Sequence, residues 1–400
     1  MGETHECIHY QIFEEGRVKI LFTAPFWSHK VNSISKGPIY LATQRHDVLI
    51  ITAQKSDSLK GKVMAPASET IEGAEFFRPY SDSKELTWRP QVCWPEVREK
   101  VDNFYPDVIV GFGDPFYRLP LKLSRHFNIP LVMFFEYLRL DKFSLPFHGG
   151  GKIRKWSPRF YRFCSSLFRR YLVRQCSAVM FSYYGDRVLI PNIERDCPIV
   201  RYVPWCTETD EEDGEETQNR NVGIYIGSLN AFKNTAELVA AIPLILDRTA
   251  TERFIVVGPG DFASRIKQMA ERYGSRLEYI ESVPRPEAMS LLRSAGYGYT
   301  PVTDCGLGFI GDCWSTGTPL ITTHELDGYL NRDVDTIVVD GLLELPGVID
   351  SLMSDNELFE RIRLGGRNRY ESSLTARAVG EKYMEVLRHV VRSWPDKVFK

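Results

Sequence analysis

A series of short apolar runs, separated by segments of helix length, is the feature that most restricts the fold of this chain. Such runs are typical of buried parallel strands, and the amphipathic segments between them are typical of helices that cover both faces of a parallel sheet. The sequence therefore predicts an α/β protein built from doubly wound sheets, whose ligands bind beyond the carboxyl ends of the strands. The expected strands are residues 18–23, 47–52, 107–111, 130–135 and 178–182 in the first half of the chain, and 222–227, 254–258, 277–280, 296–301 and 319–322 in the second half.

The length and the distribution of charge both indicate two domains. A chain of 400 residues exceeds one ordinary hydrophobic core. Residues 1–206 hold 29 Lys and Arg against 21 Asp and Glu, a charge of +8, whereas residues 207–400 hold 21 against 31, a charge of −10. The break falls at an acidic run over 207–217, which is typical of a linker. We expect an N-terminal domain over residues 1–206, a linker over 207–220, a second domain over 221–375 and a last helix within 376–400.

The composition disfavours several classes of protein. No apolar run approaches the length of a membrane span, and residues 1–17 are polar and acidic, unlike a secretory signal. The eight cysteines include no Cys-x-x-Cys pair, and no His/Cys cluster has the spacing of a zinc site. We therefore expect a cytoplasmic protein with reduced thiols.

Two carboxylates bracket a glycine-bearing turn late in the chain. Asp304 and Asp312 have seven residues between them, among them Gly306, Leu307 and Gly308. A strand that leads into a glycine turn and then a helix leaves backbone N–H groups free, and such a site suits phosphate. The second acid, one or two turns into the helix, could accept hydrogen bonds from paired sugar hydroxyls. The alternative is the ordinary strand–turn–helix of an α/β protein.

Residues 301–321, which include Gly317-Thr318-Pro319, align without a gap with the signature of one enzyme family. This segment resembles the acid, Gly-Phe-Gly-Leu, acid and Gly-Thr-Pro signature of the retaining nucleotide-sugar glycosyltransferases of GT-B fold, the glycogen-synthase-like and sucrose-synthase-like family. A second family motif is Gly-Arg-Leu with a Lys six residues after the Gly, and residues 227–233 match it. The resemblance extends more weakly over residues 18–390. It implies two facing Rossmann-like domains, a C-terminal helix that crosses back to the first domain, and sugar transfer from a nucleoside diphosphate to an acceptor hydroxyl.

The resemblance also implies roles for individual residues. Lys233 takes the place of the diphosphate-binding Lys, whereas Ser228 replaces the family's Arg, so one cation is missing. Asp312 replaces the acid that holds the ribose hydroxyls, and Asp304 the acid near the donor sugar. The loop over residues 281–285 resembles the one whose main chain contacts the base. The residues expected at the donor are Lys233 and Asp304 as catalytic groups, and Gly227, Ser228, Val283, Gly306, Leu307, Gly308 and Asp312 as binding groups.

The first domain departs further from the family. Many relatives carry a Gly-Gly pair after the opening strand, where residues 29–33 stand here, and a His where this chain has Glu136. Glu136 either binds a hydroxyl of the donor sugar or acceptor, as a third catalytic group, or is an acid at the end of a strand. The acid pair Asp333 and Asp335 lies late in the chain, beyond the donor motif, so we reject it as a metal site. We expect no metal and no cofactor other than the nucleotide sugar as co-substrate.

Residues 152–174 hold eight Lys and Arg with no acid, interleaved with aromatic residues. Basic and apolar residues on one helix are typical of a segment that lies on an anionic membrane surface. We assign Arg159, Arg162, Arg169 and Arg170 to membrane or acceptor contacts. This interpretation predicts a lipid-linked acceptor and a peripheral position on the cytoplasmic face of a membrane. The alternatives are a helix packed into the core and a nucleic-acid patch, but no recognition motif supports nucleic acid as a partner.

Two other functions stay open from the sequence. The missing Arg, Gly-Gly pair and His are compatible with a non-catalytic GT-B protein that binds a partner transferase or a glycan. The second alternative is a different enzyme of the same architecture, a sugar-nucleotide epimerase or phosphorylase. The sequence names neither the donor sugar, the nucleobase, the acceptor nor the oligomeric state.

Overall fold

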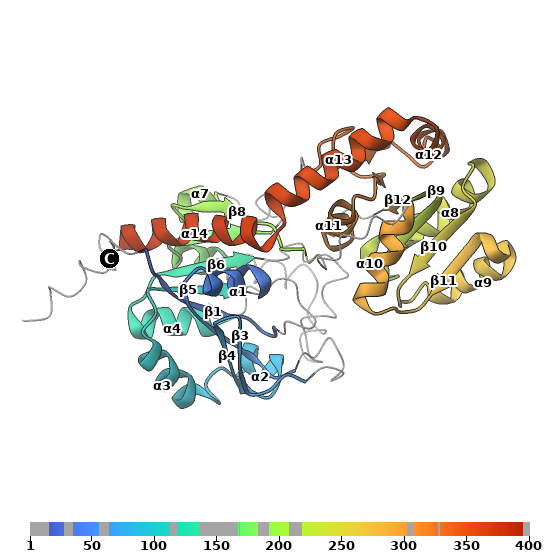
Figure 1. Ribbon diagram of the computed structural model, residues 1–400. Coiled ribbons are helices and arrows are strands. Elements are labelled where there is room, and N and C mark those ends of the chain that lie inside the picture. Colours follow the sequence, from blue (N-terminus) through green and yellow to red (C-terminus); the bar gives the residue numbers. More distant parts are fainter. Residues whose placement is uncertain are drawn as a thin grey trace, which may run out of the picture. The chain divides into compact units, whose positions relative to one another are not determined.

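The computed structural model describes residues 16–27, 35–55, 64–112, 118–135, 167, 169–182, 192–207, 218–301, 307–326 and 329–394. The chain divides into two compact units (Figure 1). Unit 1 consists of Met1–Pro204 and Val379–Lys400, and unit 2 of Trp205–Ala378. The sequence placed the corresponding boundaries at 206 and 375. Most of the predicted linker, residues 208–217, lies outside the described residues.

Unit 1 is built on one sheet with the strand order β3-β4-β2-β1-β5-β6-β7-β8. All neighbouring strands are parallel except β3 and β4, which form an antiparallel hairpin. The strands are β1 (Lys19–Thr23), β2 (Asp47–Ala53), β3 (Ser68–Ile71), β4 (Ala74–Tyr80), β5 (Val108–Phe112), β6 (Leu131–Phe135), β7 (Ala178–Phe181) and β8 (Val200–Tyr202). The strands that the sequence predicted are among them, whereas β3, β4 and β8 were not predicted.

The helices of unit 1 pack their apolar sides on this sheet. One core cluster joins alternate side chains of the strands, such as Leu21, Leu49 and Ile109, to apolar residues of the helices, such as Val97 and Leu123. Helices of the described part are α1 (Lys36–Thr43), α2 (Ser83–Trp88), α3 (Trp94–Phe104), α4 (Leu119–Phe127), α7 (Ile193–Asp196) and α14 (Ala376–Ser393), and residues 169–174 are also helical.

Helix α14 comes from the end of the chain and packs on unit 1 from residue 379 onwards. Its Tyr383 ring lies 5.9–6.2 Å from the rings of Phe22, Phe112 and Phe134, which come from the central strands β1, β5 and β6. A Cβ added at Gly380 would lie 2.5 Å from the Tyr40 ring of α1, so only glycine allows the two helices to approach this closely. The predicted return of the C-terminal helix to the first unit is therefore confirmed.

Unit 2 is built on a second sheet, with the order β11-β10-β9-β12-β13-β14, in which every strand pair is parallel. The strands are β9 (Asn219–Ile226), β10 (Arg253–Val257), β11 (Leu277–Ile280), β12 (Ala295–Thr300), β13 (Leu320–Thr322) and β14 (Ile337–Val338). The helices are α8 (Thr235–Arg248), α9 (Ala263–Tyr273), α10 (Arg285–Ser294), α11 (Leu307–Thr316), α12 (Leu345–Ser354) and α13 (Asn356–Ser373), with short 3₁₀ turns η5 (Ala231–Lys233) and η6 (Gly274–Arg276). The prediction of two doubly wound α/β units is confirmed.

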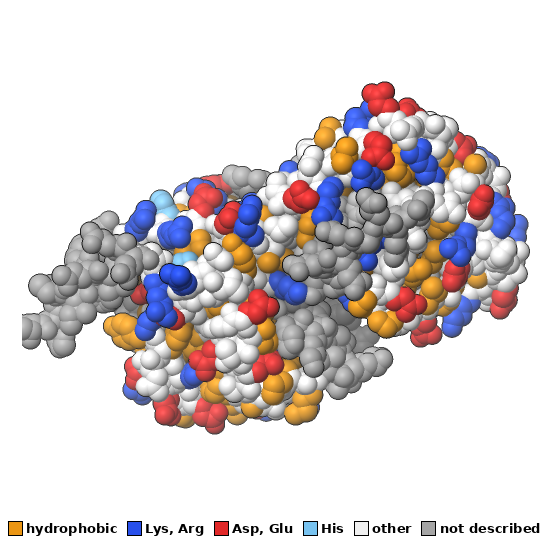
Figure 2. Space-filling view, in the orientation of Figure 1, with side chains coloured by type: hydrophobic (Ala, Val, Ile, Leu, Met, Phe, Trp, Pro, Cys, Tyr) orange, Lys and Arg blue, Asp and Glu red, His pale blue; other side chains and the backbone are white. Residues whose placement is uncertain are grey.

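The surface carries both signs of charge. On the face shown in Figure 2, Lys and Arg side chains are interspersed with Asp and Glu over the described parts of both units. Helix α13 carries two ion pairs whose members lie about one helical turn apart: Arg363 with Glu360 and Arg367 with Glu371, each with an N–O distance of 2.8 Å. Within the described part of the chain, no helix combines the length and the apolar character needed to cross a bilayer.

Candidate functional site

The predicted donor residues of unit 2 gather at the carboxyl edge of its sheet. From β9 the chain adds β10 and β11 on one side, and then returns to add β12, β13 and β14 on the other side of β9. The topological switch point therefore lies between β9 and β12, which is where ligands of such sheets bind. Lys233 follows β9, and helix α11, which carries Gly308 and Asp312, follows β12. The two predicted donor motifs thus flank one switch point.

The connections at the ends of β9 and β10 are packed too closely for side chains. A Cβ added at Gly258, where φ is 146°, would lie 1.9 Å from the carbonyl oxygen of Gly227. A Cβ at Gly260, where φ is 153°, would lie 2.2 Å from the carbonyl oxygen of Leu229. These glycines therefore hold the segment that contains Ser228 in place through backbone contact.

Asn230 links Ser228 to Lys233. Its side-chain oxygen accepts a hydrogen bond from the backbone N–H of Lys233 at 3.0 Å, and its Nδ2 donates to Ser228 Oγ at 3.3 Å. Its carbonyl oxygen accepts from the hydroxyl of Thr235, the first residue of α8, at 2.7 Å. Sequence reasoning missed Asn230, although an Asn before a short helical turn is a common N-cap residue and could have been recognised.

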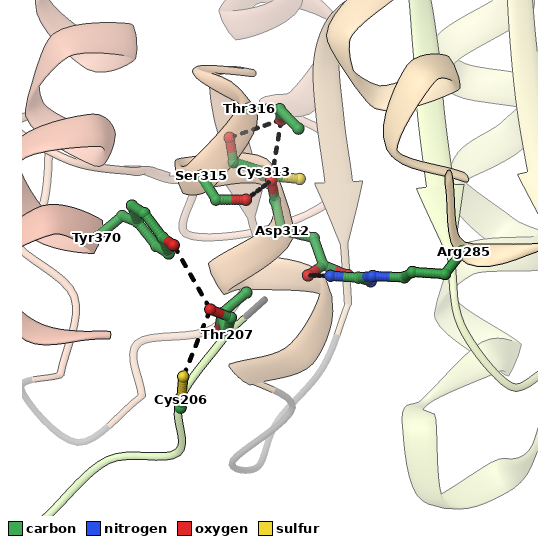
Figure 3. A network of polar contacts seen from close by, with 8 residues as sticks. All are labelled: Cys206, Thr207, Arg285, Asp312, Cys313, Ser315, Thr316 and Tyr370. Carbon is green, nitrogen blue, oxygen red and sulfur yellow. Dashed lines mark hydrogen bonds and ion pairs between the residues drawn. The ribbon is translucent and has the colours of Figure 1, made fainter. Parts of the chain in front are cut away.

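Asp312 is buried in α11 and forms an ion pair with Arg285 (Figure 3). Arg285 Nη1 donates to Oδ2 and Nη2 donates to Oδ1, each at 2.6 Å, so the pair is bidentate. The Asp312 side chain is 9% exposed and that of Arg285 is 40% exposed. A carboxylate oxygen has two lone pairs, so the two hydrogen bonds from Arg285 do not use the full accepting capacity of Asp312.

The sequence predicted a role only for the main chain of the loop that contains Arg285, namely contact with the base. A signal for the side chain was present, because Arg285 is the first residue of α10. The positive end of the helix dipole disfavours a cation there, so an Arg at this position needs another partner. Val283 lies in the same loop and is half-buried.

Solved structures share this architecture, although no protein-family model and no curated protein matches the sequence. Sucrose-phosphate synthase from Thermosynechococcus elongatus superposes with a TM-score of 0.71 at 13% identity, covering 94% of this chain and 100% of its own. A glycosyltransferase from Rickettsia africae gives 0.64 at 13%, covering 94% and 99%. HepE from Anabaena, solved in complex with UDP-glucose, gives 0.61 at 14%, covering 93% and 100%. The chain has the GT-B fold.

Several predicted residues of this GT-B protein lie outside the described residues, namely Asp304, Gly306, Glu136, Arg159 and Arg162. Leu307 is the first residue of α11. Gly308 is exposed in the first turn of that helix, and an added Cβ there would have no heavy atom of the described residues within 4 Å. Among the described residues, the space beside Gly308 is therefore unfilled, which is compatible with the donor interpretation.

The described part of the basic stretch corrects one predicted contact. Arg169 is only 6% exposed, so the structure does not support a membrane role for its side chain. Arg170 and Arg174 are 43% and 53% exposed and donate to the Asp196 carboxylate at 3.0 and 3.2 Å. The hydrogen bond from Arg170 lowers the pKa of Asp196, so this carboxylate stays charged. The two partly exposed arginines in the described part of this stretch are therefore organised around one acid.

The acid pair that sequence analysis rejected as a metal site has a place in the fold. Asp335 is buried and its Oδ1 accepts the backbone N–H of Asn331 at 3.0 Å. Burial raises the pKa of Asp335. Asp333 has a left-handed backbone, with φ of 59°. Among the described residues, no group of three or more His, Cys, Asp or Glu side chains could hold a metal ion.

Proposed function

We propose that this protein is a retaining glycosyltransferase that moves a sugar from a nucleoside-diphosphate sugar to an acceptor hydroxyl. The observation that carries the proposal is the placement of Lys233 and the Arg285–Asp312 pair around the switch point of unit 2. A diphosphate needs cations and N–H donors, and a ribose needs a hydrogen-bond acceptor, and this edge offers both kinds of group. The GT-B fold supports the same assignment, and the solved complexes of HepE hold UDP and UDP-glucose.

Each residue has a defined task in this proposal. Lys233, helped by Ser228 and the first amides of α11, binds the diphosphate and stabilises it as it leaves. Asp312, whose orientation the pair with Arg285 fixes, accepts the ribose hydroxyls. The acceptor attacks from the face that the phosphate leaves, and the leaving phosphate takes the acceptor proton. Asp304 and Glu136 contact the donor sugar or the acceptor, and no step requires a metal ion.

Calorimetry and product analysis with a panel of nucleoside-diphosphate sugars test this function. We expect at least one donor to bind and to be consumed, with the anomeric configuration kept in the product, as read by proton NMR. If no donor binds or reacts at millimolar concentration, the proposal is wrong.

A non-catalytic GT-B binding protein is the second candidate. The chain has Ser228 where the resembling family has an Arg, so the leaving diphosphate has one cation fewer. Tight donor binding without turnover would favour this candidate. A new nucleotide sugar among the products would instead identify an epimerase.

The acceptor that fits the basic stretch of unit 1 is lipid-linked, on the cytoplasmic face of an anionic membrane. Two apolar side chains of this stretch are exposed near the exposed Arg170 and Arg174: Leu167 is 54% and Tyr171 is 44% exposed. Three arginines, Arg170, Arg174 and Arg195, form ion pairs with Asp196, and they outnumber the two acids of α7, Glu194 and Asp196, by one. Apolar and cationic groups together are the composition of an interfacial surface.

A further inference from the structure

Glu237, in the first turn of α8, lies at the centre of a polar cluster at the carboxyl ends of β12 and β13. Its Oε2 accepts hydrogen bonds from Asn234 Nδ2 at 2.7 Å and from His324 Nε2 at 2.9 Å. Its Oε1 accepts from the hydroxyls of Tyr299, at 3.4 Å, and Thr323. The carboxylate can only accept, so the Nε2 of His324 is the protonated ring nitrogen. Four donors thus converge on one carboxylate: one from the N-cap of α8, one from β12 and two from the residues after β13.

Asn234 extends this cluster to the end of β12. Its Nδ2 has two hydrogens, and two acceptors are in reach: Glu237 Oε2 and the carbonyl oxygen of Pro301, at 3.0 Å. The 3.3 Å contact between this Nδ2 and His324 Nε2 joins two donors and is a packing contact. Asn234 has a left-handed backbone, with φ of 51°, and directly follows Lys233. The residue after the predicted diphosphate-binding Lys is therefore tied to Pro301, across the switch point.

The hydrogen bonds of this cluster are not needed to pack α8 on the sheet. The Glu237 side chain is 19% exposed, so its charge is largely withdrawn from water, and its hydrogen bonds offset that cost. The apolar side of α8 already packs through Leu238, Ile242 and Ile245, which are fully buried. Through its hydrogen bonds, the Glu237 carboxylate fixes the distance between the Lys233 turn and the ends of β12 and β13.

We propose that Glu237 and Asn234 are positioning residues for the donor diphosphate. They fix the turn that carries Lys233 against Pro301, so that the Lys233 ammonium meets the diphosphate in one geometry. The inference rests on the proposed function, because it assigns the diphosphate to Lys233. It has a specific consequence: loss of the cluster weakens the contacts to the outer phosphate and leaves those to the ribose and base intact.

Asn234→Gly is the decisive variant, because glycine keeps the left-handed backbone while the side-chain donors are lost. Calorimetry compares the nucleoside diphosphate that binds best, chosen from UDP, GDP and ADP, with the matching monophosphate. We expect the ratio of the affinities for the diphosphate and the monophosphate to fall about tenfold. This is roughly the effect of losing one charge-assisted hydrogen bond. Glu237→Gln, which is isosteric, should act in the same direction. Lys233→Ala combined with Asn234→Gly should lose no more than Lys233→Ala alone, because both act on one contact.

The matched control is Asn128→Gly, at the end of α4 in unit 1, where Asn128 is also left-handed with φ of 54°. It should leave the diphosphate preference unchanged. An Asn234→Gly variant that keeps the wild-type preference, while Lys233→Ala loses it, overturns the proposal and makes the cluster purely structural.

Hydrogen exchange of the unliganded protein separates this inference from the proposed function. Asn234→Gly should speed exchange both in peptides that cover residues 230–235 and in peptides that cover residues 299–301. Asn128→Gly should change exchange in neither set. Faster exchange at 230–235 alone overturns the tie to Pro301, whatever the ligand does. If the wild type binds no nucleoside diphosphate, the proposed function and the donor role fail, and the exchange result still decides whether the two segments are coupled.

Discussion

The guanidinium of Arg285 and the carboxylate of Asp312 form two parallel hydrogen bonds of 2.6 Å, between the first residue of α10 and the middle of α11. The pair fixes the orientation of an acid that is one methylene shorter than the usual Glu of the resembling family. In the proposed function Arg285 is therefore a positioning residue of the donor site, because it fixes the orientation of the Asp312 carboxylate.

Asp312→Asn tests the ribose assignment. The wild type should bind a nucleoside diphosphate about tenfold more tightly than its 2′-deoxy form, because one hydrogen bond to a charged acceptor is lost. In Asp312→Asn this preference should disappear, and the melting temperature should fall because the pair with Arg285 is broken. Calorimetry with both nucleotides gives the ratio, and Asp261→Asn, at an exposed acid of unit 2, is the control. An unchanged preference in Asp312→Asn would place the ribose elsewhere.

The strands of the two sheets could be predicted because their side chains are buried on both faces, which gives continuous apolar runs. The residues of β1, β2 and β5 after the first position of each strand are all buried. Strands β3 and β8 lie at the edges of the sheet and are half-exposed, so their sequences carry no such run.

The side-chain partners at the site could not be predicted from the sequence. Lys233 and Asp312 belong to local motifs, and a motif can be recognised by its spacing. Arg285 is 27 residues from Asp312, and Glu237 is 87 residues from His324. Such pairs are set by where parallel strands end in space, which the sequence of either segment does not contain.

Lys233→Ala should lower the rate of sugar transfer about a hundredfold, because one preorganised donor to the leaving group is lost. The side chain is half-buried at the end of η5 and outside the apolar core, so the melting temperature should stay within a few degrees of the wild type. Initial rates with saturating donor measure the effect. Lys267→Ala is the matched control, since Lys267 is exposed on α9 of the same unit. A Lys233→Ala variant with a near-wild-type rate would contradict the diphosphate assignment.

Acid should destabilise unit 1 through His46. This histidine is buried and its Nδ1 accepts the backbone N–H of Val18 at 3.1 Å. Burial, and then the charge of Arg388, lower the pKa of His46 in the folded protein. Below about pH 6.5 the unfolded chain therefore binds a proton that the folded chain does not, so stability rises with pH over that window. The slope is at most about 1.4 kcal/mol per pH unit for one proton.

His46→Asn keeps an acceptor for the Val18 N–H and removes the titration. We expect urea unfolding at several values between about pH 5 and 7.5 to show a flatter pH dependence for this variant than for the wild type. His126→Asn, at an exposed histidine of α4, should keep the wild-type slope. Equal slopes in the wild type and His46→Asn would show that His46 does not govern the acid limb.

Replacing Arg159, Arg162 and Arg170 with Ser should weaken binding to anionic vesicles and leave donor binding intact, because the donor residues lie in unit 2. Each cation near an anionic surface contributes about 1 kcal/mol, so three together amount to roughly a hundredfold. Two arginines remain to hold the Asp196 carboxylate when Arg170 is replaced. The same loss of charge on α9, with Arg265, Lys267 and Arg272 replaced by Ser, should change vesicle binding little. Sedimentation with anionic and neutral liposomes at low and high salt measures both variants. A wild type that ignores anionic vesicles at low salt would make a soluble acceptor the better interpretation.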